Sequence, residues 1–360
     1  MNHDFIPVMK PTLATFSQLE NYLRRIDECH VYSNHGPLVH ELEDAYAKYL
    51  GTEPELVVAI ANATLALQGL LSISNLDDWL LPNYTFAASG LAVLNAKKNL
   101  FLCDVDSEEW KIDIAKLDDS VKDFGMMPVM PFGSQVDFVP YSQFKTVIVD
   151  AAASLGQTPP DFKAMNPNWA VVYSLHATKV LGAGEGALAI CGSLEMAKRL
   201  RAWINFGFQE GRISSLAGTN AKMSEVNAAY GLHSITNLEN EKKEWLVSQE
   251  QVAIWGEGRE WNSHINQIAS FQPYWIAQFR NKKTKIAISK VLATSGIQSR
   301  EWWATPLSTQ ETFKHTPLLN GSEISEFLSE TSLGLPMFRG LTMESIRRVI
   351  NIIDESLLIL

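Results

Sequence analysis

Short runs of apolar residues alternate with helical patterns through the first part of the chain, and this alternation constrains the possible folds more than any other feature. The clearest runs lie at residues 56–60, 79–82, 99–104, 127–131 and 146–150. Each is short and continuously apolar, which is typical of a strand buried on both faces. Such strands alternating with helices predict an α/β fold with a mostly parallel sheet covered by helices on both faces.

Polar residues at the ends of these runs are the first candidates for a functional site, because ligands of parallel sheets bind beyond the carboxyl ends of the strands. The run 56–60 leads directly into a helical pattern that begins with Asn62, Ala63 and Thr64. Free backbone amides and the positive end of a helix dipole at such a junction can bind an anion. Alternatively, Asn62 or Thr64 only caps the helix.

A carboxylate ends the run at residues 146–150. Asp150 is followed by three alanines, so no large side chain blocks access to it. A carboxylate in this position can pair with the protonated nitrogen of a pyridine ring and so make the ring an electron sink. It can equally cap a following helix, and the sequence leaves both roles open.

A lysine lies between two further apolar runs. Residues 170–190 have the pattern of a strand, a polar turn with Ser174, His176, Thr178 and Lys179, a glycine-rich segment and a second strand. Lysine is seldom buried without a partner, and burial lowers the pKa of an amine and makes it a usable nucleophile. One use of such an amine is a Schiff base with pyridoxal phosphate (PLP), so we predict that Lys179 is the catalytic lysine.

Length and composition predict two domains and limit the partners. The 360 residues exceed one ordinary core, and a change of character near residue 240 predicts a large domain (1–240) and a smaller C-terminal domain (241–360). A net charge of -10 disfavours binding to nucleic acid or to an anionic membrane, and polar residues interrupt the most apolar stretch. Three separated cysteines without a CxxC motif predict a reduced compartment, the cytoplasm, and no metal site.

Taken together, these features resemble the sugar-nucleotide aminotransferases of the DegT/StrS type, which are PLP-dependent enzymes of fold type I. The similar segments span nearly the whole chain in the family's order. They are SNHGPLVHELEDAYAKYLG (33–51), ANATLAL (61–67), NYTFAAS (83–89), VIVDAAASLG (147–156), YSLHATKVLGAGEGALAI (173–190), GTNAKMSEVNAAYGL (218–232) and SLGLPM (332–337). The resemblance implies a large domain with a mostly parallel seven-stranded sheet between helices, plus a smaller C-terminal α/β domain.

The resemblance also implies roles for single residues. Lys179 forms the Schiff base with the cofactor and then carries a proton, and Asp150 pairs with the pyridine nitrogen. The other cofactor contacts that it implies are the phosphate ligands Ala63, Thr64 and Ser174, the stacking ring of Phe86, and Asn220, which reaches the cofactor of the neighbouring subunit. This last contact implies a homodimer with shared active sites.

Several of these residues also have a purely structural alternative. Phe86 can belong to the core, Ser174 can stabilise its turn, and Asn220 can cap a helix. A nucleoside diphosphate needs cationic or amide partners. The candidate substrate contacts are His35, in a turn near the N-terminus, and Arg212, in the loop that we expect nearest the dimer interface.

Three positions depart from the family's usual pattern. Ala63 replaces a glycine of the phosphate turn, Ala153 replaces a glutamine that lies against the cofactor ring oxygen, and Ala187 replaces the last glycine of GEGG. None removes a group that the chemistry requires, and together they leave room for an atypical substrate or reduced activity.

The resemblance implies that the chain moves an amino group from L-glutamate to a keto sugar on a nucleoside diphosphate. The segments IPVMKP, SNHGPL and GTNAKMSE are most similar to enzymes that aminate C4 of dTDP-4-keto-6-deoxy-D-glucose for O-antigen or other surface glycans of bacteria. Amination at C3 of a dTDP-3-keto-6-deoxyhexose is the close alternative. A related dehydratase carries histidine in place of Lys179, and a non-catalytic PLP-binding regulator has no need of both Lys179 and Asp150.

Overall fold

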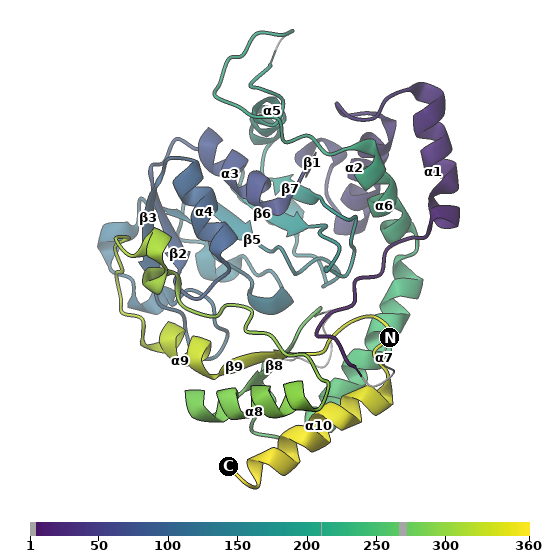
Figure 1. The fold of residues 1–360 in the computed structure, drawn as a ribbon. Coiled ribbons are helices and arrows are strands. Elements are labelled where there is room, and N and C mark those ends of the chain that lie inside the picture. The colour runs from purple at the N-terminus through teal and green to yellow at the C-terminus, as the bar shows by residue number, and fades with distance from the viewer. Residues whose placement is uncertain (1–4, 210, 266–271) are drawn as a thin grey trace.

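The computed structural model describes residues 5–209, 211–265 and 272–360 (Figure 1). Its centre is a seven-stranded sheet with the order β1-β7-β6-β5-β4-β2-β3. The strands are β1 (Val57–Ile60), β2 (Asp78–Pro82), β3 (Asn99–Cys103), β4 (Gly125–Met126), β5 (Val147–Asp150), β6 (Trp169–Ser174) and β7 (Ala187–Cys191). Neighbours from β3 to β6 pair in parallel, and β7 runs antiparallel to both β6 and β1, so the predicted mostly parallel sheet is confirmed.

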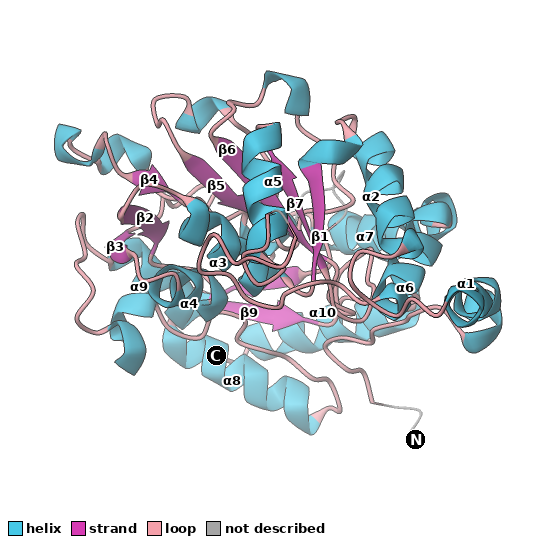
Figure 2. Cartoon of the chain, turned by 90° about the horizontal axis from the view of Figure 1, so that it is seen from above, coloured by secondary structure: helices cyan, strands magenta, loops and turns pink. Residues whose placement is uncertain are grey.

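Helices cover both faces of this sheet, as Figure 2 shows. Side chains alternate between the two faces of a strand, so Val58 and Ile60 join the core under one face and Val57 and Ala59 the core under the other. The first core includes residues of α3 (Ala63–Ile73), α4 (Ala87–Asn95) and α5 (Leu194–Trp203). The second includes residues of α1 (Phe16–Cys29), α2 (Pro37–Leu50) and α6 (Glu225–Thr236).

Six of the seven predicted strands are present, including both within residues 170–190, and the prediction for residues 127–131 is wrong. The strand there, β4, has only two residues, Gly125–Met126. Pro128 and Pro131 have no backbone N–H to donate to a neighbouring strand, which explains why the ladder ends early. Beyond β4, contact with β5 continues only as an isolated bridge between Val129 and Asp150.

A second, two-stranded antiparallel sheet lies below the first in Figure 1 and consists of β8 (Trp275–Gln278) and β9 (Ser332–Leu335). It packs with α8 (Lys282–Thr294), α9 (Glu323–Thr331) and α10 (Met343–Leu357). The long helix α7 (Leu238–Gly256) leads into this part. The predicted boundary after residue 240 falls inside α7, and a division at that point stays a prediction.

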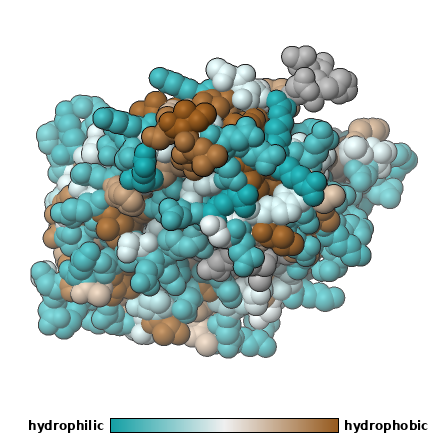
Figure 3. Space-filling view, turned by 90° about the horizontal axis from the view of Figure 1, so that it is seen from below, coloured by the Kyte–Doolittle hydropathy of each residue, from teal (hydrophilic) through white to brown (hydrophobic). Residues whose placement is uncertain are grey.

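Polar residues cover most of the face that contains this second sheet and its helices, and apolar residues lie there in separate patches (Figure 3). This agrees with amphipathic helices that bury one side and expose the other. Within the described residues, every helix is too short or too polar to cross a lipid bilayer.

Candidate active site

The turn that carries Lys179 connects the antiparallel strands β6 and β7 and is held from several sides. The backbone N–H of Lys179 donates to the carbonyl oxygen of His176 (2.9 Å). Gly184 has a φ of +81°, which side chains rarely tolerate. From α6, Asn227 Nδ2 donates to the carbonyl oxygen of Ala183 (2.8 Å). These contacts fix the backbone from which the lysine side chain extends.

The Lys179 side chain is half-buried and has a partner, whereas the pattern suggested a buried lysine without one. Its Nζ donates to the hydroxyl oxygen of Tyr274 at 2.8 Å and lies 5.3 Å from the centre of the tyrosine ring. Sequence reasoning missed Tyr274. The two residues are 95 positions apart, and the tyrosine directly precedes β8 in the second sheet, so no local pattern marks the contact.

Asp150 ends β5 and is only 6% exposed. Its Oδ2 accepts a hydrogen bond from Ser89 Oγ (2.7 Å), and its Oδ1 accepts one from the backbone N–H of Ala152 (3.1 Å). Burial raises the pKa of Asp150, while these two donors and the positive charge of Lys179 oppose the rise. Residues 151–157 form turns instead of a helix, so the alternative role of a helix cap is wrong.

The junction between β1 and α3 has the expected form. Asn62 caps α3, because its Oδ1 accepts from the backbone N–H of Leu65 (2.9 Å). Ala63 and Thr64 are the first two helical residues and are half-buried. The first amides of a helix have no acceptor within the helix, so those of Ala63 and Thr64 face outward along its axis, where the dipole favours an anion.

Ser174, at the end of β6, is 6% exposed. Its Oγ accepts from the backbone N–H of His176 (3.1 Å), so the alternative role of stabilising the turn is confirmed. His176 also supports this turn: its Nδ1 lies 2.8 Å from Thr178 Oγ1, and its Nε2 lies 3.7 Å from Glu185 Oε1. A serine that accepts here still has its own hydroxyl proton to donate to a ligand.

Two of the alternative structural roles are wrong. Phe86 is 60% exposed at the start of α4 and does not belong to the core. Asn220 does not cap α6, because Ser224 does so. Asn220 is exposed, and its Oδ1 accepts from Lys222 Nζ (2.7 Å).

The two candidate substrate contacts, His35 and Arg212, differ in their surroundings. Arg212 is exposed in the loop before α6. His35 has a φ of +56°, and its buried Nε2 has no hydrogen-bond partner among the described residues. Burial, reinforced by nearby positive charges of which Arg201 is the largest, lowers the pKa of His35 to about 4, so the ring is neutral at pH 7.

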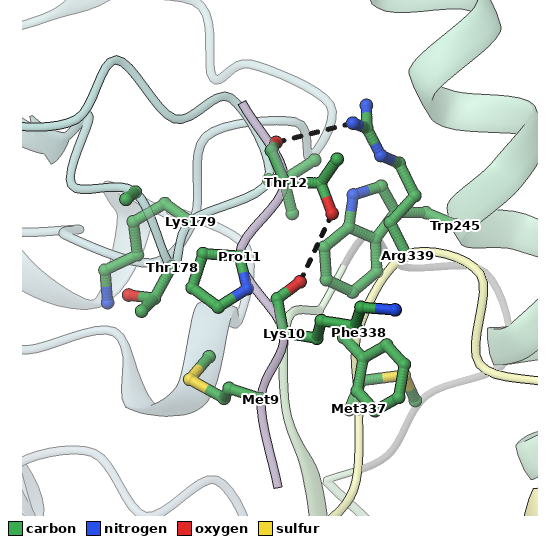
Figure 4. A pocket seen from close by; sticks show the side chains of 12 residues that line it. Met9, Lys10, Pro11, Thr12, Thr178, Lys179, Trp245, Met337, Phe338 and Arg339 are labelled. Carbon is green, nitrogen blue, oxygen red and sulfur yellow. Dashed lines mark hydrogen bonds between the residues drawn. The ribbon is translucent and has the colours of Figure 1, made fainter. Parts of the chain in front are cut away.

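A cavity lies beside the Lys179 turn, between the N-terminal segment at residues 9–12 and residues 337–339 (Figure 4). Arg339 Nη2 donates to the carbonyl oxygen of Thr12 (3.3 Å) and so ties the N-terminal segment to this wall. In Figure 4 the amine of Lys179 points away from the N-terminal segment, and therefore away from the wall of the cavity that this segment forms.

Comparison with known proteins places this arrangement in a family. The model of the DegT/DnrJ/EryC1/StrS aminotransferase family matches residues 16–354. The dTDP-4-amino-4,6-dideoxy-D-glucose transaminase of Shigella dysenteriae is 29% identical over 241 residues, which cover 64% of this chain and 65% of that protein. This chain thus matches slightly less than two-thirds of that relative's length.

Two further relatives match over most of their length. The GDP-perosamine synthase of Caulobacter vibrioides is 26% identical over 348 residues, which cover 90% of this chain and 91% of that protein. The crystal structure of DesI in the presence of its TDP-sugar product superposes with a TM-score of 0.83 at 25% identity, covering 97% of this chain and 92% of that one.

Proposed function

Because the chain belongs to the DegT/DnrJ/EryC1/StrS aminotransferase family, we propose that it transfers an amino group from L-glutamate to a keto sugar on a nucleoside diphosphate, with PLP as cofactor. The family and the fold predicted from the sequence are confirmed. One observation carries the proposed chemistry. Asp150 ends β5, and Lys179 follows the end of β6, which pairs in parallel with β5, so both lie at the edge where such sheets bind ligands.

The residues at this edge fit the cofactor. Lys179 offers a primary amine for the aldehyde, and Asp150 offers a buried carboxylate for the ring nitrogen. The N-terminus of α3 and the hydroxyl of Ser174 offer donors for the phosphate. When bound, PLP supplies an electron sink that stabilises negative charge at the carbon next to the transferred nitrogen.

We assign Asp150 to the ring nitrogen because a buried carboxylate needs a partner. Its two donors, Ser89 and the N–H of Ala152, are both neutral groups. A positively charged ring nitrogen is the partner that repays the cost of burying the negative charge. In this role Asp150 keeps the ring nitrogen protonated, while Ser89 orients the carboxylate.

Lys179 acts twice in the proposed reaction. Its amine would hold the aldehyde of the cofactor, and once freed by the amino donor it would carry the proton that leaves the α-carbon of the donor. The second half of the reaction, with the keto sugar, runs through the same residues in reverse. The fixed backbone of the β6–β7 turn suits a group that must act at two carbons, one on each side of the transferred nitrogen.

A second copy of the chain completes the site in this proposal. Asn220 is exposed and does not point into its own core, which suits a residue that reaches the phosphate of the neighbouring subunit. We assign Arg212 to the substrate on the same basis, as an exposed group that a partner subunit covers, and His35 because its buried Nε2 has no hydrogen-bond partner among the described residues. A homodimer with shared active sites follows, and the cytoplasmic location stays a prediction.

We further propose dTDP-4-keto-6-deoxy-D-glucose as the acceptor, aminated at C4 for a surface glycan such as O-antigen. The support is the name of the Shigella relative and the TDP-sugar of the DesI structure. The Caulobacter relative is named for a GDP-linked sugar, so a GDP-sugar is an acceptor to test beside it. The alternatives, amination at C3 and a non-catalytic regulator, give different results in the absorbance experiment described next.

The experiment records the absorbance of the PLP-loaded protein before and after L-glutamate, then after each keto sugar nucleotide. The wild type should show a visible cofactor band that glutamate bleaches and the correct sugar restores. Lys179→Ala should lack this band, whereas Lys145→Ala, at an exposed lysine paired with Asp123, should behave like the wild type. A band that glutamate leaves unchanged would support the regulator, and a protein that binds no PLP would refute the proposal.

A further inference from the structure

We propose that Tyr274 is a positioning residue that holds the amine of Lys179 during proton transfer, an inference that rests on the proposed transaminase function. The distance of 2.8 Å between Lys179 Nζ and the Tyr274 hydroxyl oxygen is that of a normal hydrogen bond. The amine lies 5.3 Å from the ring centre, so the hydroxyl lies between the amine and the ring. Tyr274 thus contacts the amine through its hydroxyl, and the ring holds that hydroxyl in place.

The ring of Tyr274 is itself held in place, so its hydroxyl has a defined position. It meets the ring of Trp302 edge-on at 5.1 Å and the ring of Phe132 edge-on at 5.7 Å. The next residue, Trp275, is fully buried and begins β8. A free lysine side chain loses up to about 2 kcal/mol of rotamer entropy when it is ordered. A rigid acceptor that orders the amine beforehand removes that cost from the reacting step.

The contact joins the two sheets of the protein. Lys179 is anchored between β6 and β7 of the large sheet, whereas Tyr274 is anchored at β8 of the small one. Aromatic stacking fixes the two parts against each other: Phe132, from the loop after β4, lies 4.3 Å from the ring of Trp303 at an angle of 23°. Phe132 has a φ of +51°, an uncommon backbone conformation for such a residue. The packing of the two sheets therefore sets the distance between the hydroxyl and the amine.

A neutral hydroxyl suits this role better than a carboxylate. An amine that moves a proton between the two carbons on either side of the transferred nitrogen must return to the same place in each half-reaction. A misplacement of about 1 Å can cost a reaction about 100-fold in rate. A phenol oxygen accepts a hydrogen bond from the amine without pairing it with a negative charge that competes for its proton. Loss of the hydroxyl alone should therefore slow proton transfer and leave donor binding unchanged.

The test compares Tyr274→Phe, which keeps the ring, with Tyr22→Phe on α1 as the matched control. In the cofactor-free protein, the pH dependence of Lys179 acetylation by acetic anhydride, measured by mass spectrometry, reports on the amine itself. In the PLP-loaded protein, single-turnover absorbance with L-glutamate and with α-deuterated L-glutamate reports on proton transfer. Thermal unfolding midpoints equal to that of the wild type show that both variants fold.

We expect Tyr274→Phe to shift the acetylation profile and to slow the single turnover about 10- to 100-fold. The half-saturating glutamate concentration should stay unchanged, the deuterium isotope effect should grow, and Tyr22→Phe should match the wild type throughout. A wild-type turnover rate in Tyr274→Phe overturns the proposal, with or without a shifted acetylation profile. If the wild type itself does not react with glutamate, the proposed function is wrong and the positioning role falls with it, while the acetylation profile separately shows whether the contact exists.

Discussion

Replacing Ser89 by alanine tests how the ionised form of Asp150 is maintained. Ser89 Oγ donates to Asp150 Oδ2 at 2.7 Å, and the aspartate is 6% exposed, so water has little access to replace the lost donor. A hydrogen bond to a charged group contributes about 1.5–3 kcal/mol. Since about 1.4 kcal/mol corresponds to a factor of ten, Ser89→Ala should change the ratio of carboxylate to acid roughly 10- to 100-fold.

The direction of the change follows from the balance around the carboxyl group. Burial raises the pKa of Asp150, and Ser89 is the largest of the groups that oppose the rise. Without Ser89 the pKa rises further, and the neutral acid, which cannot pair with a protonated ring nitrogen, persists to higher pH. We expect the low-pH limb of the glutamate half-reaction, measured by stopped-flow absorbance of the cofactor, to move to higher pH, with little change in rate above it.

Two control variants sharpen this experiment. Ser89→Thr keeps a hydroxyl at the same position and should retain most of the wild-type pH profile. Ser356→Ala removes a hydroxyl that donates to the carbonyl oxygen of Ile352 in α10 and should leave the profile unchanged. An unshifted low-pH limb in Ser89→Ala would refute the reasoning, because the hydrogen bond would then contribute nothing to the ionisation of Asp150.

Four further predictions concern stability and assembly. The buried carboxylate of Glu225 accepts from two N-terminal amides of α2, so Glu225→Ala should lower the free energy of unfolding in urea by about 3 kcal/mol, and a loss no larger than that of Glu225→Gln would contradict this. Gly184→Ala places a side chain at a φ of +81° and should cost about 1 kcal/mol and weaken PLP binding, measured by equilibrium dialysis. Burial raises the pKa of the Glu241 carboxyl from 4.5 to about 7. Between pH 4.5 and 7 the folded protein therefore holds a proton on Glu241 that the unfolded chain releases, so Tm should fall as the pH rises through this range. Glu241→Gln should make Tm less dependent on pH there. Mixing inactive Lys179→Ala and Asn220→Ala proteins should restore about a quarter of wild-type activity if subunits exchange and share sites, and no recovery would contradict the shared site.

The residues found from the sequence are those whose surroundings are local in the chain. Asp150 and the β1–α3 junction were identified because a strand and the residues that follow it form a continuous pattern. Strand β4 was misplaced because the apolar run there includes Pro128 and Pro131, and the pattern of apolar residues does not show which backbone amides are missing.

The contacts that the sequence could not show join distant parts of the chain. Ser89 and Asp150 are 61 positions apart, and Lys179 and Tyr274 are 95 apart, so each pair meets only through the packing of whole elements. For Phe86 the sequence left two roles open, a ring that stacks on the cofactor and a residue of the core, and its 60% exposure decides against the core. The role of Asp150, as a partner of the cofactor ring or as a helix cap, also depended on whether a helix follows it. The sequence composition did not show that a turn follows instead.

The degree of exposure of the candidate residues is itself an argument about assembly. Asp150 and Ser174 are each only 6% exposed in a single chain, whereas Phe86 leaves 60% of its surface uncovered and Asn220 is exposed. Leaving a large aromatic ring in water costs free energy in proportion to its exposed apolar area, about 25 cal/mol per Å². The proposed cofactor covers the ring of Phe86, and the proposed partner subunit covers the loop of Asn220. Each proposal thus accounts for a surface that a single chain leaves in contact with water: Phe86 should become less accessible when PLP binds, and Asn220 should become less accessible when the dimer forms.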